Sequence, residues 1–200
     1  MTFDLMDEHA GEAYKILASL VTPRPIAWVT TVNAEGVVNA APFSFFNVFG
    51  SNPPLVAFAP GNREPGVPKD TALNIRERGE FVINLVDEPV AEAMNATAAS
   101  LPHDQSELEN SGLNLLAGES VRVPRIAECP AALECKKHSI LEIGGNRLVI
   151  GIVQRVHVRD GIFDPESHRL DPNSYRPIGR MASPHWYCRT EELFEMKRPD

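Results

Sequence analysis

One short stretch combines residue types that could bind a planar ligand. Residues 39–47 place three phenylalanines within four positions, and the run contains Ser44 and ends at Asn47. Flat apolar rings beside hydroxyl and amide groups suit a flat molecule with polar edges. Pro42 lacks a backbone N–H, so we expect sheet pairing to stop on that side. Composition alone favours a simpler alternative, in which the aromatic side chains form a buried turn that plugs one end of a barrel.

A second stretch could bind an anion. Arg63 and Lys69 flank a loop rich in proline and glycine, and this loop leads into a predicted helix. A helix N-terminus presents free backbone N–H groups and a partial positive charge, which nearby cations reinforce. Thr71 adds a hydroxyl donor, and Thr30 and Thr31 on an earlier strand could add more, so the set matches a phosphate dianion. A solvated loop with an ordinary helix cap is an equally open alternative.

The other reactive side chains lack the spacing of a catalytic or metal site. The six histidines are scattered, with no pair at metal-ligand spacing and none joined to a cysteine in a zinc pattern. Nothing in the neighbourhood of Cys135 or Cys188 supports either as a nucleophile. We therefore predict no metal and no catalytic protein residue. A flat-walled pocket with a phosphate anchor indicates that a bound cofactor carries the reaction.

The elements that must position these residues indicate an antiparallel β architecture. The predicted strands follow one another as hairpins with few helices between them. Residues 144–146, Gly-Gly-Asn, are the strongest hairpin signal, and Gly79 suits the left-handed end of a helix that Asp70 or Thr71 can cap. No glycine-rich phosphate loop of the nucleotide-binding folds occurs. We expect strands at 26–32, 37–41, 55–59, 80–86, 131–143 and 147–159, helices at 9–20, 69–78, 88–98 and near the C-terminus, and loops at 60–68 and 99–120.

Length and composition bound the class of protein. The 200 residues, 43% hydrophobic and 23% charged, predict one soluble globular domain spanning residues 1–200. A net charge of −8 with no long basic run argues against nucleic acid or an anionic membrane as partner. No stretch approaches the ~18 consecutive apolar residues of a membrane span. The acidic N-terminus lacks the start of a signal peptide, so a cytoplasmic location is expected. Three cysteines without a Cys-x-x-Cys pair argue against a disulfide framework.

Five segments carry a resemblance to a known family. They are 23–31 (Pro-Arg-Pro-Ile-Ala-Trp-Val-Thr-Thr), 39–47 (Asn-Ala-Ala-Pro-Phe-Ser-Phe-Phe-Asn), 53–56 (Pro-Pro-Leu-Val), 69–75 (Lys-Asp-Thr-x-x-Asn-Ile) and 80–84 (Glu-Phe-Val-Ile-Asn). The tail at residues 177–187 is similar to the family's closing segment. In order and spacing over nearly the whole chain, the sequence resembles the flavin reductase-like family, the FMN-binding split-barrel flavoproteins that include flavoredoxin.

The resemblance implies a mainly β fold, a six-stranded antiparallel split β-barrel of Greek-key type with peripheral helices. It also implies a homodimer with FMN bound near the interface. The implied activity is that of an NAD(P)H-dependent flavin reductase. NADH or NADPH would bind transiently, and hydride would pass from the nicotinamide to flavin N5 and then to a small-molecule acceptor. Two alternatives stay open: a non-catalytic FMN-binding electron carrier or sensor dimer, and a split barrel that holds haem or a pyridoxine phosphate.

The resemblance further assigns individual residues to the flavin. The two threonines of the first strand would lie beside the flavin, residues 41–47 would cradle its ring, and the 63–71 segment would hold the phosphate. The tail, with His185 and Tyr187, would approach the pocket, with the partner subunit as a candidate source. The implied cofactor-binding residues are Thr30, Thr31, Ala41, Pro42, Phe43, Ser44, Phe45, Asn47, Arg63, Lys69, Thr71 and His185.

Overall fold

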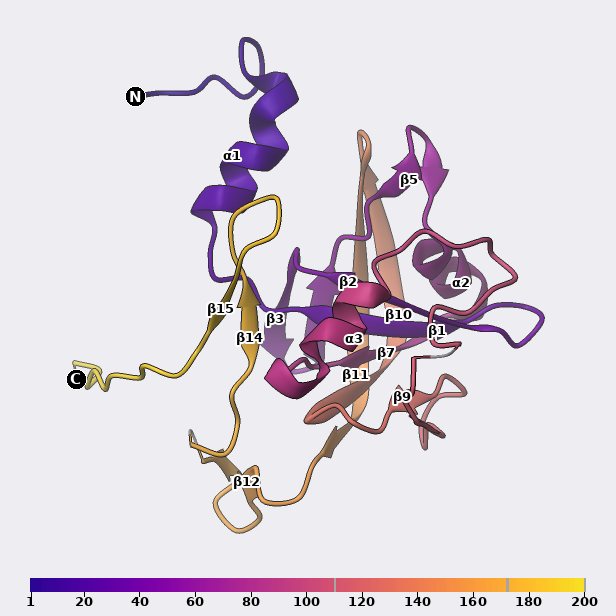
Figure 1. Ribbon diagram of the computed structural model, residues 1–200, viewed down its shortest axis with the longest axis vertical. Coiled ribbons are helices and arrows are strands. Elements are labelled where there is room, and N and C mark those ends of the chain that lie inside the picture. Colours follow the sequence, from indigo (N-terminus) through magenta and orange to yellow (C-terminus); the bar gives the residue numbers. More distant parts are fainter. Residues whose placement is uncertain (110, 172, 200) are drawn as a thin grey trace.

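A seven-stranded antiparallel sheet forms the centre of the computed structural model, which describes residues 1–109, 111–171 and 173–199 (Figure 1). The strand order is β2-β1-β7-β10-β11-β4-β3. These strands are β1 (Ala27–Val32), β2 (Val38–Phe43), β3 (Phe46–Ser51), β4 (Pro54–Phe58), β7 (Glu80–Asn84), β10 (Ala131–Ile143) and β11 (Asn146–Val158). The mainly β, antiparallel prediction is confirmed. The predicted count of six strands is corrected to seven, and within the described residues the sheet runs from edge β2 to edge β3 without closing into a barrel.

The phenylalanine-rich stretch is more regular than the sequence predicts. β2 runs through Pro42, which lies opposite Trp28 of β1, so pairing with β1 continues past this residue. Only one side of β2 pairs with a strand of the main sheet, and a missing N–H is tolerated on the other side of an edge strand. β3 begins at Phe46, so only Ser44 and Phe45 separate the two edge strands. Because each residue spans at most ~3.6 Å, this short link brings the two edges together and curls the sheet.

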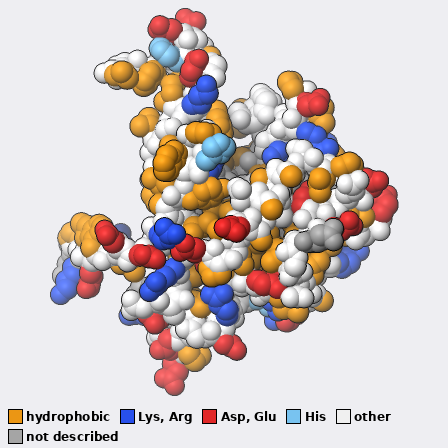
Figure 2. Space-filling view, in the orientation of Figure 1, with side chains coloured by type: hydrophobic (Ala, Val, Ile, Leu, Met, Phe, Trp, Pro, Cys, Tyr) orange, Lys and Arg blue, Asp and Glu red, His pale blue; other side chains and the backbone are white. Residues whose placement is uncertain are grey.

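The helix α1 (Ala13–Leu20), preceded by the short 3₁₀ helix η1 (Ala10–Glu12), projects from the rest of the chain (Figure 1). Its apolar stripe is not covered: Tyr14 is 60% exposed and Leu20 is 72% exposed. Hydrophobic side chains also gather beneath this helix on the visible face of the molecule (Figure 2). Exposed apolar side chains gathered on one face of a molecule are typical of a surface that contacts a partner.

Helix α2 (Asp70–Arg78) begins beside the predicted anion site. It ends at Gly79, whose φ of 72° is the left-handed conformation expected there. The predicted cap by Asp70 or Thr71 is wrong, because Lys69 occupies the N-cap position and no side chain of the described residues caps the helix. The carboxylate of Asp70 bonds Arg63 and His103 instead. The third helical segment is η2 (Glu88–Val90) followed by α3 (Ala91–Ala96), which is slightly shorter than predicted.

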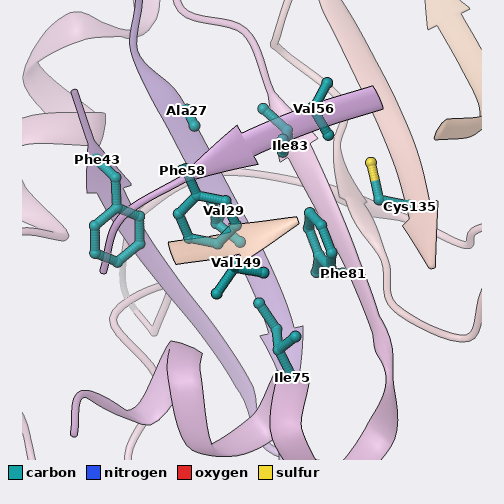
Figure 3. Packing of buried hydrophobic residues seen from close by; sticks show 10 residues of the cluster. All are labelled: Ala27, Val29, Phe43, Val56, Phe58, Ile75, Phe81, Ile83, Cys135 and Val149. Carbon is teal, nitrogen blue, oxygen red and sulfur yellow. The ribbon is translucent and has the colours of Figure 1, made fainter. Parts of the chain in front are cut away.

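One buried cluster packs aromatic rings from several strands inside the curled sheet (Figure 3). The ring centroids of Phe43 and Phe58 lie 5.3 Å apart, and those of Phe58 and Phe81 lie 5.6 Å apart. Phe58 and Phe81 are fully buried. Both pairs are tilted, and ring separations in this range are favourable between aromatic side chains. They fix Phe43, the first phenylalanine of the predicted ligand site, against the core.

A second buried cluster joins β1 to α3. Trp28 is fully buried, and its indole Nε1 donates a hydrogen bond of 2.9 Å to Thr97 Oγ1 at the end of α3. Met94 of α3 packs in the same cluster. Successive strand residues face opposite sides, so Trp28 anchors α3 while its neighbour Val29 packs in the first cluster. The helix is thereby held beside the β2 end of the sheet.

Shorter elements complete the chain. The predicted loop 60–68 holds a small hairpin of β5 (Asn62–Glu64) and β6 (Val67–Pro68). The described residues 190–199 contain no helix, so the prediction of a helix near the C-terminus is wrong. The tail forms a ribbon of β14 (Ile178–Arg180) and β15 (Tyr187–Arg189). The remaining pairs are β8 (Leu115–Leu116) with β9 (Arg125–Ile126), and β12 (Phe163–Asp164) with β13 (Arg169–Leu170). Among the described residues, none of the helices has the length and apolar character needed to traverse a bilayer.

Candidate functional site

The phenylalanine-rich bend lines a hollow of about 450 Å³, called here the ring hollow. That volume falls within the ~300–1,000 Å³ typical of small-ligand pockets. Segments distant in sequence meet around it: the bend, the start of α2, helices α1 and α3, and the tail ribbon. Its walls include Tyr14, Pro42, Phe43, Ser44, Phe45, Asn62, Lys69, Met94, Asn95, Arg180 and Tyr187.

Aromatic faces and cations alternate in the ring hollow. Lys69 Nζ lies 5.6 Å from the centroid of the Phe43 ring. Tyr14 and Phe45 face each other across the α1 side, with centroids 5.9 Å apart. On the tail side, the guanidinium carbon of Arg180 lies 4.7 Å from the centroid of Tyr187. A planar, electron-poor or anionic molecule would meet flat apolar surfaces and positive charge together in this hollow.

Arg24 fixes the position of the bend. The side chain is buried, and its Nε donates a hydrogen bond of 3.3 Å to Ser44 Oγ. The guanidinium also donates to the carbonyl oxygens of Ala18, Val21 at 2.7 Å and Met181 at 3.0 Å. Burial lowers the pKa of Arg24, and Tyr14 and Arg180 exert smaller, opposing effects. One cation thereby joins helix α1, the bend and the tail.

A second, smaller hollow of about 60 Å³, the anion hollow, lies at the N-terminus of α2. It brings together the three predicted phosphate ligands, Arg63, Lys69 and Thr71. Pro42 and Lys69 line both hollows, so the predicted ring end and the predicted phosphate end adjoin. Ala41 also lines the anion hollow.

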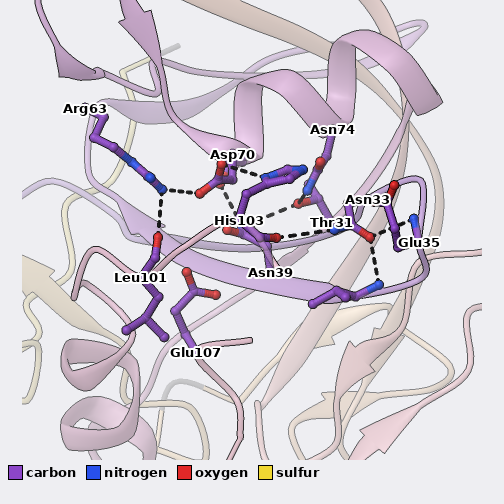
Figure 4. A network of polar contacts seen from close by, with 12 residues as sticks. Thr31, Asn33, Glu35, Asn39, Arg63, Asp70, Asn74, Leu101, His103 and Glu107 are labelled. Carbon is purple, nitrogen blue, oxygen red and sulfur yellow. Dashed lines mark hydrogen bonds and ion pairs between the residues drawn. The ribbon is translucent and has the colours of Figure 1, made fainter. Parts of the chain in front are cut away.

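Carboxylates as well as cations surround the anion hollow (Figure 4). Arg63 pairs with Asp70 and donates a hydrogen bond of 3.1 Å to the carbonyl oxygen of Leu101. His103 Nδ1 lies 2.7 Å from the other oxygen of Asp70. Glu107 Oε2 accepts a hydrogen bond of 3.0 Å from the backbone N–H of Ala40. Arg63 and Asp70 therefore already satisfy each other, whereas the charge of Lys69 is directed at the hollows.

Lys69 is the cation best placed for an anionic ligand. Burial lowers the pKa of its ammonium, and the positive charge of Arg63 lowers it further. No carboxylate among the described residues forms an ion pair with it. A partly buried charge without a counterion is costly, and a bound anion would relieve that cost.

Two predicted ligands, Thr30 and Thr31, line neither hollow. Both are fully buried, and Thr30 Oγ1 donates a hydrogen bond of 2.7 Å to the carbonyl oxygen of Pro124. Thr31 Oγ1 accepts from Asn74 at 3.0 Å and from Asn39 at 3.4 Å. Thr30 and Thr31 thus lie behind the two hollows and do not line them.

Asn47 and His185 also lie apart from the ring hollow. Asn47 is exposed on β3, where its Oδ1 accepts from the backbone N–H of Val48 at 2.8 Å, and it lines a separate hollow beside α1. His185 lines a hollow of about 500 Å³ at the tail. That tail hollow shares Met94, Asn95 and Tyr187 with the ring hollow, so His185 is a neighbour of the predicted ring site.

Sequence reasoning missed several wall residues. Tyr14 carried only a helical-period signal, and nothing local indicated that it would meet Phe45. Arg24 was visible between two prolines, but its bond to Ser44 depends on the folded chain. Met94 and Asn95 reach the hollow because Trp28 holds α3 in place. These contacts are long-range, so no spacing in the sequence could predict them.

A family model described as a flavin reductase like domain matches residues 19–178. The chain belongs to the flavin reductase-like family. The resemblance drawn from the five sequence segments is therefore confirmed. The matched range contains the bend, the α2 start and the whole main sheet.

Solved structures of relatives agree with this assignment. The 2-nitrobenzoate 2-nitroreductase of Pseudomonas fluorescens is 35% identical, with a TM-score of 0.89 over 100% of this chain and 96% of that one. Component B of the nitrilotriacetate monooxygenase of Bacillus cereus is also 35% identical, with a TM-score of 0.91 over 98% of each chain. A split-barrel domain protein of Shewanella frigidimarina, named as a flavin reductase, matches all of both chains at 22% identity and a TM-score of 0.81. This last likeness concerns the fold alone.

Proposed function

We propose that the protein is an FMN-dependent oxidoreductase, most simply an NAD(P)H:flavin reductase, with residues 1–200 as one split-barrel domain. The observation that carries the proposal is the junction of the two hollows at Lys69 and Pro42. One hollow has the flat apolar walls that suit a three-ring system, and the other has the cations and helix N-terminus that suit a phosphate. A planar ring linked to a phosphate requires both features side by side.

The chain's own groups would bind and orient this ligand. Lys69 would supply charge to the phosphate, α2 would supply backbone N–H groups, and Thr71 a hydroxyl. At the ring end, Phe43 would supply apolar contact, and the Ser44 hydroxyl, held by Arg24, would face the polar edge. The flavin, when bound, would supply the hydride chemistry between nicotinamide and acceptor.

No cysteine of the core is suited to act as a nucleophile. Burial raises the pKa of the Cys135 thiol far above its usual value, and the charge of Glu134 raises it further. Burial likewise raises the pKa of Cys129, with smaller contributions from Asp87 and Glu128. A protonated thiol is a poor nucleophile at neutral pH. A role for the protein in binding and orienting a redox cofactor is consistent with this.

We also propose a homodimer. Val48 and Phe49 on edge strand β3 are 63% and 66% exposed, and the apolar stripe of α1 is also uncovered. Apolar surface of this kind is typically buried against a partner. Since Tyr14 of α1 lines the ring hollow, a partner packed there would lie beside the ligand. Light scattering at micromolar concentration is expected to give twice the 22.0 kDa chain mass, and a monomer mass would contradict the proposal.

Two measurements test the function and separate it from its alternatives. The purified protein is expected to bind FMN with a flavin absorption spectrum, and to consume NADH or NADPH repeatedly when FMN is supplied. Bound flavin without turnover would favour an electron carrier or sensor, and a haem or pyridoxine phosphate spectrum would exclude the flavin. The two 35% identical relatives are named for different reactions, so the acceptor is left to direct assay.

A further inference from the structure

One segment closes the anion hollow from outside. Residues 99–109, called here the strap, follow α3 and cross the N-terminus of α2 (Figure 4). Four hydrogen bonds hold the strap there. The Leu101 carbonyl oxygen accepts from Arg63, the His103 ring bonds Asp70, and Glu107 accepts from the Ala40 N–H. The fourth runs from Asn33 Nδ2 to the His103 carbonyl oxygen at 3.3 Å. Ala99 and Ser100 line the same hollow. The strap therefore contributes both walls and charge to the predicted phosphate site.

The charges around the hollow pose a problem for a phosphate. Arg63 on β5 and Lys69 beside α2 are positive, while Asp70 on α2 and an ionised Glu107 on the strap are negative. These two positive and two negative charges cancel. Asp70 is engaged by Arg63 and His103, whereas among the described residues the Glu107 carboxylate accepts a hydrogen bond from one other residue, at Oε2 from the Ala40 N–H. A phosphate dianion entering the hollow would meet the other oxygen of Glu107, and like charges in a partly buried site repel strongly.

We propose, building on the proposed function, that Glu107 binds the phosphate end of the ligand in its protonated form. One carboxyl oxygen keeps the Ala40 N–H bond, and the other carries the proton and donates it in a hydrogen bond to a phosphate oxygen. Binding of a phosphorylated ligand then takes up one proton from solvent. Glu107 thereby makes affinity for the phosphate group depend on pH.

The environment of Glu107 favours the protonated form. Burial has the largest effect and raises the pKa of the Glu107 carboxyl. Hydrogen bonds from the Ala40 N–H and from its own backbone lower this pKa in part. The negative charge of Asp70 raises the pKa and the positive charge of Arg63 lowers it. An incoming phosphate adds further negative charge and raises that pKa again. Between the pKa of the free protein and that of the complex, the dissociation constant should rise by up to about tenfold per pH unit.

The experiment compares FMN with riboflavin, which has the same ring and no phosphate. Apoprotein is titrated with each flavin by fluorescence quenching from pH 5 to pH 8, for the wild type, Glu107→Gln and the matched exposed control Glu109→Gln. FMN has a phosphate pKa of its own near 6, but this acts equally in all variants. The part of the pH dependence of FMN affinity that Glu107→Gln removes is therefore due to the Glu107 carboxyl.

The expected result is that FMN affinity of the wild type and Glu109→Gln falls more steeply with pH than that of Glu107→Gln. At pH 8 Glu107→Gln should bind FMN about tenfold more tightly than the wild type. Riboflavin should bind all three alike at every pH. Calorimetry in buffers of different ionisation enthalpy should count one proton fewer taken up by Glu107→Gln. Glu107→Ala, which also lacks the carboxyl, should show the same reduced slope.

Three outcomes would overturn the inference. Equal pH slopes for FMN in the wild type and Glu107→Gln would reject the role of Glu107 while leaving the proposed function intact. Equal affinities for FMN and riboflavin in the wild type would reject the phosphate site itself. Binding of neither flavin would reject the proposed function and the inference with it. A variant His103→Gln that alone removes the slope would assign the proton to His103 instead and so overturn the role of Glu107.

Discussion

Replacement of Lys69 by methionine tests the electrostatic half of the proposed site. The side chain is partly buried, lies 5.6 Å from the Phe43 ring, and lines both hollows. Among the described residues no carboxylate pairs with it, so its removal leaves no partner charge exposed. Lys69→Met keeps a long apolar stem against Phe43 and removes only the ammonium. The variant should therefore fold with a free energy of unfolding within about 1 kcal/mol of the wild type.

The expected loss can be worked from the contact. A hydrogen bond between charged groups contributes about 1.5–3 kcal/mol. Since 1.4 kcal/mol is a factor of ten in an equilibrium constant, Lys69→Met should weaken FMN binding about 10- to 150-fold. Riboflavin makes no phosphate contact, so its affinity should change by less than about threefold.

Flavin fluorescence titration measures both ligands in one assay at pH 7 and moderate salt. Lys136→Met serves as the matched control, because Lys136 is exposed on β10 and lines neither hollow. The double variant Arg63→Ala with Lys69→Ala should weaken FMN binding further, at some cost to stability because Asp70 loses its ion pair with Arg63 and, among the described residues, keeps only its contact with His103. Equal losses for FMN and riboflavin in Lys69→Met would refute the assignment of Lys69 to the phosphate.

Two further predictions concern stability. Glu134 is fully buried, and burial alone would raise the pKa of its carboxyl. Hydrogen bonds from two backbone N–H groups and from His157 outweigh this effect, so the pKa is lowered. Glu134→Gln should lose about 2–5 kcal/mol by chemical denaturation at pH 7, and should lack the part of the wild-type stability that disappears as pH falls below about 4. Gly118→Ala would place a Cβ against the backbone carbonyl oxygens of Val121 and Val123 and should lower the free energy of unfolding by about 1–3 kcal/mol, whereas Gly11→Ala, with open space around it, should not.

Local signals in the sequence predicted the elements that depend on local physics. The long hairpin of β10 and β11 was predicted almost to the residue, because Gly144 and Gly145 mark a turn between two apolar runs. Gly79 likewise marked the end of α2. Strand β3 was missed because its residues show no clean alternation, and its pairing depends on β4. The expected C-terminal helix was wrong, since the described residues 192–199 are all exposed and a short helix there would lack the stabilisation of tertiary packing.

In the candidate site, too, local signals predicted some features and long-range packing decides the others. The bend and the α2 start were each found from their own residues, and the fold brings them together at Lys69. The roles of Thr30 and Thr31 could not be read locally, because a threonine on a strand faces either the ligand or the interior. Burial decides between these, and burial depends on what packs against β1. Asn47 lies outside the ring hollow for a related reason, since it stands on strand β3 and lines the hollow beside α1.

Thr31 belongs to a buried hydrogen-bond network behind the anion hollow, although its side chain does not line the hollow. Asn39 Nδ2 donates to Thr71 Oγ1 at 3.0 Å and lies 3.4 Å from Thr31 Oγ1, while Asn74 donates to the same threonine at 3.0 Å (Figure 4). These bonds tie β1, β2 and α2 together beneath the hollow. The side-chain amides of Asn39 and Asn74 donate in this network, whereas Asn74 Oδ1 has no hydrogen-bond partner among the described residues. Buried donors that are paired stay in place, because each would pay a desolvation cost if it moved away. Thr71 and the α2 N-terminus are thus held in place before any ligand arrives, and less conformational entropy is lost on binding.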